Sequence, residues 1–180
     1  PLAQRLTGEQ LAALDETLGV LGLSRDEFDT RPAWHIALVL QATQAQRLGL
    51  RPDFGIDYQL LQSAQQFSTP VIELEGTENQ VEILLRLADG GIELLQDTLT
   101  HWHENARLLQ VMLIWWLESP PVEEPLTLPT TFSASLHDVL MHQRNQAWCE
   151  RLLALPPGHY VVAAGALHLY GEGNLPALLR

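Results

Sequence analysis

Three residues, a histidine and two acids, stand where they could bind a metal or transfer a proton. His168 follows Gly165 by three residues, and Asp57 and Glu75 each lie within two residues of a glycine. Aspartate, glutamate and histidine are the ligands of catalytic divalent-metal sites, and an acid beside a histidine can also transfer protons without a metal. We therefore expect these three side chains to form a catalytic or metal-binding site.

An arginine–asparagine pair is the second unusual feature. Arg144 and Asn145 lie in the middle of an otherwise ordinary helical segment. The fork of a guanidinium group suits a carboxylate, which could belong to a substrate or to Glu75. A solvated arginine is the structural alternative, and spacing alone favours it.

Each candidate residue receives an expected role. We assign catalytic roles to His168, Glu75 and Arg144, a metal-ligand role to His168, and substrate-binding roles to Asn145, Asp57 and Gly165. A structural role competes with these assignments. Aspartate is among the commonest helix caps, so the cap is favoured for Asp57, Glu75 could anchor a loop, and His168 could tie one down.

Short strands followed by helices would position these residues. Phe54–Ile56, Val71–Glu75 and Tyr160–Ala164 are short runs of this kind. Val71–Glu75 has a β-branched start and alternating apolar and acidic residues, and Tyr160–Ala164 is rich in β-favouring residues and apolar on both faces. If the strands are parallel neighbours, their carboxyl ends meet at one edge of a sheet, where ligands of open α/β sheets bind. The sequence thus predicts a mostly helical α/β fold in one domain over residues 1–180, with a small, largely parallel sheet and a large helical insertion.

Capping signals and apolar spacing predict the helices. Capping boxes at Thr7 and Ser24 open a long and a short helix, and further helices are expected from about Ala33 to Leu48, after Asp57, after Thr77, and from about Ser133 to Leu155. From Ile92 to Trp116 apolar residues recur every three or four positions, which is the spacing of a two-helix seam. That seam could pack within the domain or form a homodimer.

Composition excludes several classes of protein. The net charge is −12 and all ten basic residues are arginine. This composition argues against nucleic-acid binding, a polybasic membrane surface and lysine Schiff-base chemistry. The one cysteine, Cys149, excludes an intrachain disulfide and is expected in the core. No apolar run is long enough to span a membrane, and the cytoplasm is the favoured compartment.

Six short motifs in order resemble a known family. They are Arg31–Trp34, Phe54–Asp57, Val71–Glu75 with Gln80, Arg144–Asn145, and Gly165–His168 continuing to Gly171. In order and spacing the chain resembles bacterial members of the TraB/GumN family over nearly its whole length. The resemblance implies a fold related to the erythromycin-esterase and ChaN-like proteins.

The same resemblance implies an activity. The animal Tiki proteases, which are relatives, clip amino-terminal residues from Wnt proteins with a divalent metal, through two Gly-x-x-His motifs and an acid. This chain has only the second motif, Gly165 to His168. We therefore expect a metal-dependent, peptidase-like hydrolase using manganese, cobalt or zinc, incomplete at both ends and inactive as these 180 residues alone. The alternative is a protein that binds or sequesters a peptide or small ligand without turnover, as in inhibition of pheromone signalling.

Overall fold

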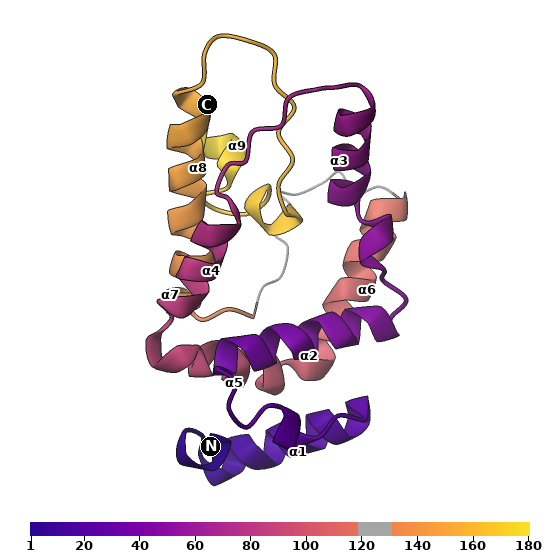
Figure 1. Cartoon of the computed structure of the whole chain (residues 1–180), viewed down its shortest axis with the longest axis vertical. Coiled ribbons are helices and arrows are strands. Elements are labelled where there is room, and N and C mark those ends of the chain that lie inside the picture. Colours follow the sequence, from indigo (N-terminus) through magenta and orange to yellow (C-terminus); the bar gives the residue numbers. More distant parts are fainter. Residues whose placement is uncertain (119–130) are drawn as a thin grey trace. The chain divides into compact units, whose positions relative to one another are not determined.

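The regular elements of the computed structural model, which describes residues 1–118 and 131–180, are helices (Figure 1). The α-helices in that part of the chain are α1 Gly8–Leu21, α2 Ala33–Arg47, α3 Ile56–Gln66, α4 Thr77–Leu85, α5 Ile92–Thr100, α6 Trp102–Glu118, α7 Ala134–His137, α8 Gln143–Leu153 and α9 Leu175–Leu178. Single 3₁₀ turns lie at Leu2–Gln4, Arg25–Glu27, Pro52–Phe54, Ala88–Gly90 and Ala166–His168, and a π turn lies at Asp138–His142. None of the described helices is long and apolar enough to span a membrane.

The expected parallel sheet is absent from the described residues, so the α/β prediction is wrong, although the mostly helical character holds. Phe54 ends a 3₁₀ turn, and residues 71–75 and 160–164 run as irregular loops. A strand exists only when a neighbour supplies a ladder of backbone hydrogen bonds. The β-favouring side chains have no such neighbour here, and Val161 is 92% exposed. Local preference was therefore a poor guide to a non-local structure.

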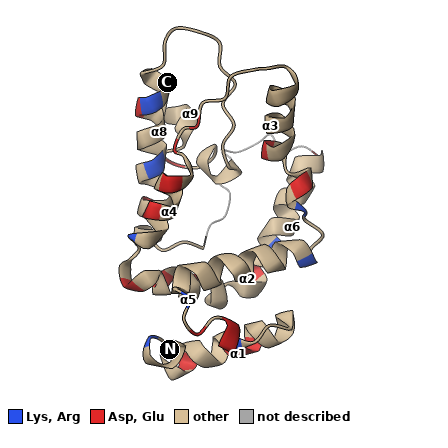
Figure 2. Ribbon diagram, viewed as in Figure 1, with Lys and Arg blue, Asp and Glu red and all other residues tan. Residues whose placement is uncertain are grey.

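Two compact units make up the chain, and each takes two stretches of sequence. Unit 1 consists of Pro1–Leu50 and Val81–Glu118, and unit 2 of Arg51–Gln80 and Ser119–Arg180. The acidic and basic residues are scattered over the helices in the described residues (Figure 2). The family resemblance implies one domain over residues 1–180, and that expectation stays a prediction.

Unit 1 is built on the packing of α2 against α5, which lie side by side (Figure 1). Helices α1, α2 and α5 each supply buried apolar side chains to its core, among them Leu14, Leu18, Ile36, Leu40 and Leu95. The predicted capping box at Thr7 is confirmed, because the Thr7 and Gln10 backbone amides donate to each other's side chains at 2.9 and 3.2 Å. This box fixes the start of α1.

A glycine allows α2 and α5 to approach closely. Gly91 precedes α5 with a φ of +85°, which favours glycine. A Cβ atom at this position would lie 2.6 Å from the Cβ atom of Trp34 in α2. Gly91 therefore marks a point where the backbones of the two helices meet.

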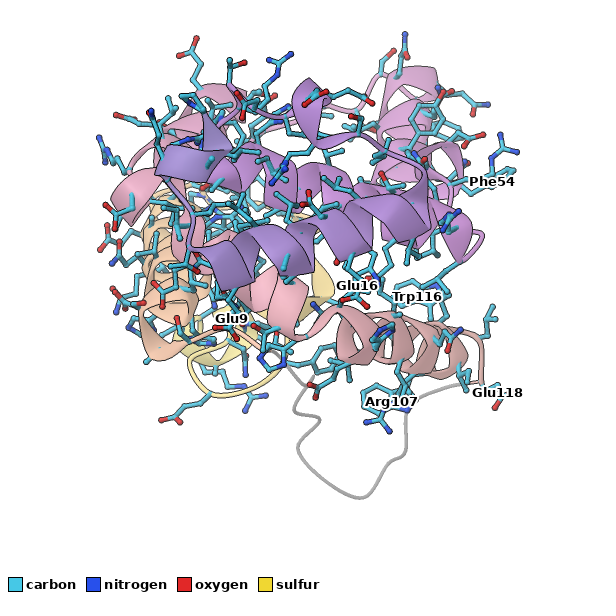
Figure 3. All side chains as sticks on the ribbon, turned by 90° about the horizontal axis from the view of Figure 1, so that it is seen from below. Glu9, Glu16, Phe54, Arg107, Trp116 and Glu118 are labelled. Carbon is cyan, nitrogen blue, oxygen red and sulfur yellow. The ribbon has the colours of Figure 1, made fainter. Side chains whose placement is uncertain are left out.

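The single helix expected from Ile92 to Trp116 is two helices, because α5 ends at Thr100 and α6 begins at Trp102. At this break the Gln44 side chain of α2 donates to the Trp102 carbonyl at 2.8 Å. The apolar face of α5 is buried within unit 1, whereas Trp116, near the end of α6 (Figure 3), is 67% exposed. The α5 part of the predicted seam thus packs within unit 1. The homodimer stays a prediction.

Unit 2 holds the helix predicted over residues 133–155, which is continuous from α7 through the π turn to α8. Helix α9 packs against α8. Trp148, Cys149 and Leu175 form a buried cluster with Leu74, Leu152 and Ala164 at its margin. The expected core position of Cys149 is confirmed, and the cluster ties the 71–75 and 160–164 loops to α8.

Candidate functional site

Helix α8 brings four of the predicted site residues together from three separate stretches of chain. Arg144 and Asn145 are consecutive residues in the first turn of α8, which begins at Gln143 directly after the π turn. Arg144 contacts Glu75, and Asn145 contacts His168. Two neighbouring side chains of one helix therefore hold the two other candidates.

Arg144 and Glu75 form a bidentate ion pair. The Nε atom of Arg144 donates to Glu75 Oε1 at 3.0 Å, and Nη2 donates to Oε2 at 2.8 Å. The Glu75 side chain is only 8% exposed and that of Arg144 is 21% exposed. Such a fork is stronger and more directional than a single charge contact. Of the two carboxylates expected for Arg144, the structure shows the one within this chain.

Two further contacts fix the arginine. Its Nη1 atom donates to the carbonyl of Leu140 in the π turn at 3.1 Å. Its guanidinium carbon lies 5.0 Å from the ring centre of Trp148, one helical turn further along α8. This is within the range of a cation–π contact. Arg144 is thus held by an acid, a carbonyl and an aromatic ring.

His168 is buried against the same helix. Its Nδ1 atom lies 2.6 Å from Asn145 Oδ1, and the Asn145 Nδ2 atom donates to the Gly173 carbonyl at 3.1 Å. The imidazole ring lies 4.3 Å from the Trp148 ring, centre to centre, at a tilt of 38°. His168 is 6% exposed and Asn145 is 4% exposed.

Burial keeps His168 uncharged. The pKa of its imidazole is lowered from 6.5 to about 4, mainly by loss of solvation and also by the positive charge of Arg144, while the negative charge of Glu75 opposes this shift. At neutral pH the ring is therefore neutral, and one of its nitrogens keeps a lone pair. A neutral imidazole can bind a metal or accept a proton.

Gly165 opens the turn that carries His168. The His168 amide donates to the Gly165 carbonyl at 2.9 Å and closes the 3₁₀ turn Ala166–His168. A Cβ atom at Gly165 would lie 3.7 Å from His168 Cδ2, the ring carbon bonded to Nε2. Because Gly165 has no side chain, it does not cover the Cδ2–Nε2 edge of the His168 ring.

Asp57 is not brought to this group of residues. It lies exposed in the first turn of α3, with no described contact to Glu75, Arg144 or His168. It is not the helix cap either, because the N-cap position belongs to Gly55. Its carboxylate can still interact favourably with the positive end of the α3 dipole, because it lies in the first turn of that helix.

Two residues of the site were not predicted from the sequence. Trp148 had the appearance of a core residue, and its four-residue spacing from Arg144 was the available signal for their contact. Its Nε1 atom is buried without a hydrogen-bond partner among the described residues. Gly173 takes part through its backbone carbonyl, which accepts from Asn145, and a backbone contact of this kind leaves no signal in the sequence.

A divalent metal, implied by the family resemblance, was tested against these side chains. His168 could supply one nitrogen ligand, but both Glu75 oxygens are held by Arg144. No three His, Cys, Asp or Glu side chains in residues 1–118 and 131–180 are grouped so that they could hold a metal. These residues therefore do not form a complete metal site within the described part of the chain.

Sequence comparison defines the class of protein to which this site belongs. The chain matches the TraB/PrgY/gumN family over residues 1–180, and it belongs to that family. It is 63% identical over 179 residues to the uncharacterised protein YbaP of Escherichia coli K12, covering 99% of this chain and 68% of that protein. YbaP of Shigella flexneri matches to the same extent. No solved structure matches.

Proposed function

We propose that this chain carries part of the active site of a metal-dependent, peptidase-like hydrolase, with His168 as its metal ligand or proton acceptor. The observation that supports the proposal is a buried, neutral histidine next to a fixed arginine–glutamate pair. Titratable groups with strongly shifted pKa values gather at functional sites more often than elsewhere. The low pKa of His168 suits a ligand better than a base, because a base works best near its own pKa.

The other residues have supporting roles in this proposal. Arg144 and Glu75 hold a fixed pair of charges beside the imidazole, and Trp148 covers the pair and the ring. A group held in place before the substrate arrives needs no reorganisation during the reaction. Because the described residues supply one metal ligand, we expect these 180 residues alone to have no hydrolytic activity, as measured by mass spectrometry of a peptide library.

Metal content tests the proposal directly. Bound manganese, cobalt and zinc are measured by elemental mass spectrometry in the full-length protein, after each metal is supplied, for the unchanged sequence, His168→Ala and His103→Ala. His103 is an exposed histidine and serves as the matched control. We expect stoichiometric metal that is lost only with His168→Ala. No metal in any sample would contradict the metal-dependent hydrolase.

A second function is a site that binds a peptide or small ligand without turnover. The observation that favours it is the closed Arg144–Glu75 pair, which leaves the acid without a free oxygen for catalysis. Calorimetry with a peptide library in the presence of a chelator tests this function. Tight, metal-independent binding without product would support it, and product formation that requires a metal would exclude it.

A further inference from the structure

We propose that Asn145 is a positioning residue that fixes His168 in a single tautomer, with the proton on Nδ1 and the lone pair on Nε2. The observation behind the proposal is a chain of three polar groups, from the Gly173 carbonyl through the Asn145 amide to the imidazole. This tautomer stands whatever the reaction is, whereas its use by a ligand rests on the proposed function.

The orientation of the Asn145 amide follows from what each neighbour can do. A carbonyl oxygen accepts hydrogen bonds and cannot donate, so the Asn145 atom 3.1 Å from Gly173 O must be the NH₂ group. The amide oxygen then faces His168 Nδ1 at 2.6 Å. Because an amide oxygen only accepts, Nδ1 must carry the proton.

Burial keeps water from replacing the hydrogen bonds between Gly173, Asn145 and His168. Asn145 and His168 are 4% and 6% exposed, so solvent has little access to either end of their contact. The opposite tautomer would place the Nδ1 lone pair against the amide oxygen and leave two buried acceptors facing each other. Buried polar groups without a hydrogen-bond partner are costly, so the equilibrium favours the tautomer with the proton on Nδ1.

The Gly173 carbonyl is itself held in place. Gly171 and Gly173 have φ values of +84° and +67°, which favour glycine and let the chain turn sharply. Asn174 closes the turn, because its Nδ2 atom donates to the Gly171 carbonyl at 2.6 Å and its Oδ1 atom caps α9 at the Ala177 amide. The acceptor that orients Asn145 is therefore part of a rigid turn.

The consequence is a defined chemical preference at Nε2. None of the described residues bonds this nitrogen, and its lone pair suits a divalent cation or an N–H or O–H donor on a ligand. Asn145 acts through His168, which replaces the substrate-binding role expected from the sequence. A positioning residue and a substrate-binding residue differ in one respect: only removal of a positioning residue changes the nuclear magnetic resonance signals of His168 when no substrate is present.

Nuclear magnetic resonance of the unchanged protein decides the tautomer. The 180-residue chain is labelled with ¹⁵N-histidine, and long-range proton–nitrogen correlations are recorded at neutral pH, with His168→Gln used to identify the His168 signals. We expect His168 entirely in the Nδ1–H form, and the exposed His103 as a mixture. A proton on Nε2 of His168, or exchange between both forms, would overturn the proposal.

Substitutions test whether Asn145 is the cause. Asn145→Ala removes the acceptor, and we expect the His168 signals to become those of a mixture, whereas Asn145→Asp keeps an acceptor and should retain the Nδ1–H form. Gln146→Ala is the matched control, because Gln146 is the next residue of α8 and contacts His142 instead. An unchanged tautomer in a folded Asn145→Ala protein would refute the role of Asn145, and if that variant does not fold, the spectrum of the unchanged protein still decides the tautomer.

Discussion

At the scale of single residues, His168 stabilises the folded chain only while it is neutral. Its pKa is about 4 in the folded protein, against 6.5 for an unperturbed histidine, so the unfolded chain binds the proton more tightly. Stability from this residue is therefore fully present above about pH 6.5 and is lost as the pH falls toward 4. The usual histidine that gains an acidic partner behaves in the opposite way.

The first prediction concerns this pH dependence. Between the two pKa values we expect the free energy of unfolding to fall by as much as about 3 kcal/mol on acidification, at 1.36 kcal/mol per pKa unit. Urea denaturation across this pH range measures it. His168→Gln should flatten the pH dependence and exposed His103→Gln should not. An equally steep profile in His168→Gln would contradict the assignment.

The second prediction concerns access to the ring. Gly165 has a φ of −56°, which alanine adopts without strain, so Gly165→Ala should fold with nearly unchanged stability. Its methyl group would lie against the Cδ2–Nε2 edge of His168 and should slow carbethoxylation of that histidine several-fold, as measured by peptide mass spectrometry. The rate at His103 is the internal control, and an unchanged rate at His168 would show that Nε2 is reached from another side.

Side-chain chemistry could be predicted at this scale better than side-chain environment. The fork of the Arg144 guanidinium group suits a carboxylate, and the pair with Glu75 shows that the solvated arginine, which spacing alone favoured, was the wrong choice. The bond between Asn145 and His168 could not be predicted, because it depends on a turn at Gly173 that lies 28 residues away from Asn145. The sequence around Asn145 does not reveal which backbone carbonyl of a turn 28 residues away will lie next to its side chain.

At the scale of elements, the Arg144–Glu75 pair attaches the 71–75 loop to α8. With Glu75 removed, a largely buried guanidinium would lose its counter-charge, and this loss costs more than an exposed pair contributes. The contact therefore decides where the loop lies as well as where the charges lie.

The third prediction tests this attachment. Glu75→Gln should lower the free energy of unfolding by about 1–3 kcal/mol. Glu82→Gln is the matched control, because it breaks the exposed Glu82–Arg86 pair on α4 and should cost less than about 1 kcal/mol. The double variant Glu75→Gln with Arg144→Gln should lose less than the sum of the two single changes. Strict additivity would mean that the pair contributes no coupling energy.

The fourth prediction concerns the contact between α2 and α5. Gly91→Ala combines a positive φ with a clash against Trp34, and should destabilise the chain by about 2–4 kcal/mol. Gly8→Ala, at the first residue of α1, meets no atom within 4 Å and should change stability by less than about 0.5 kcal/mol. Thermal unfolding compares the two. Equal stability of both variants would show that the backbones do not meet as described.

The success of prediction at this scale depends on the range of the interactions. The Thr7 box and the helix over residues 33–47 are determined by contacts within one or two turns, so the sequence predicts them well. The break at His101 lies where another helix makes contact, as the bond from Gln44 of α2 to the Trp102 carbonyl illustrates, so the pattern within residues 92–116 does not reveal it. The predicted strands failed because residues 71–75 and 160–164 have no ladder partner in the described chain.

At the scale of the whole molecule, the net charge argues against binding of nucleic acids. A net charge of −12 without lysine offers no basic stripe, and Figure 2 shows none over the described residues. The matched region covers 68% of the length of YbaP. An activity that needs the rest of such a longer protein is therefore only proposed for this chain.

The fifth prediction follows from the charge. In a gel-shift assay at low salt, where counterion release favours binding most, we expect no complex with duplex DNA or single-stranded RNA up to about 100 μM protein. A basic DNA-binding protein at the same concentration is the positive control. A salt-sensitive shift would show that the arginines gather into a binding surface after all.

The π turn has a consequence for how this family can diverge. In it the Gln143 amide bonds the carbonyl of Asp138, five residues back, so the turn holds one residue more than an α-helical turn does. The turn therefore covers with one more residue about the same rotation as an α-helical turn, and α7 and α8 keep the alignment of one continuous helix. A single-residue deletion within 138–142 is expected to restore a regular helix with Arg144 and Asn145 still on the same face of α8. The contact that would change is the bond from Arg144 to the Leu140 carbonyl, because that carbonyl lies inside the turn.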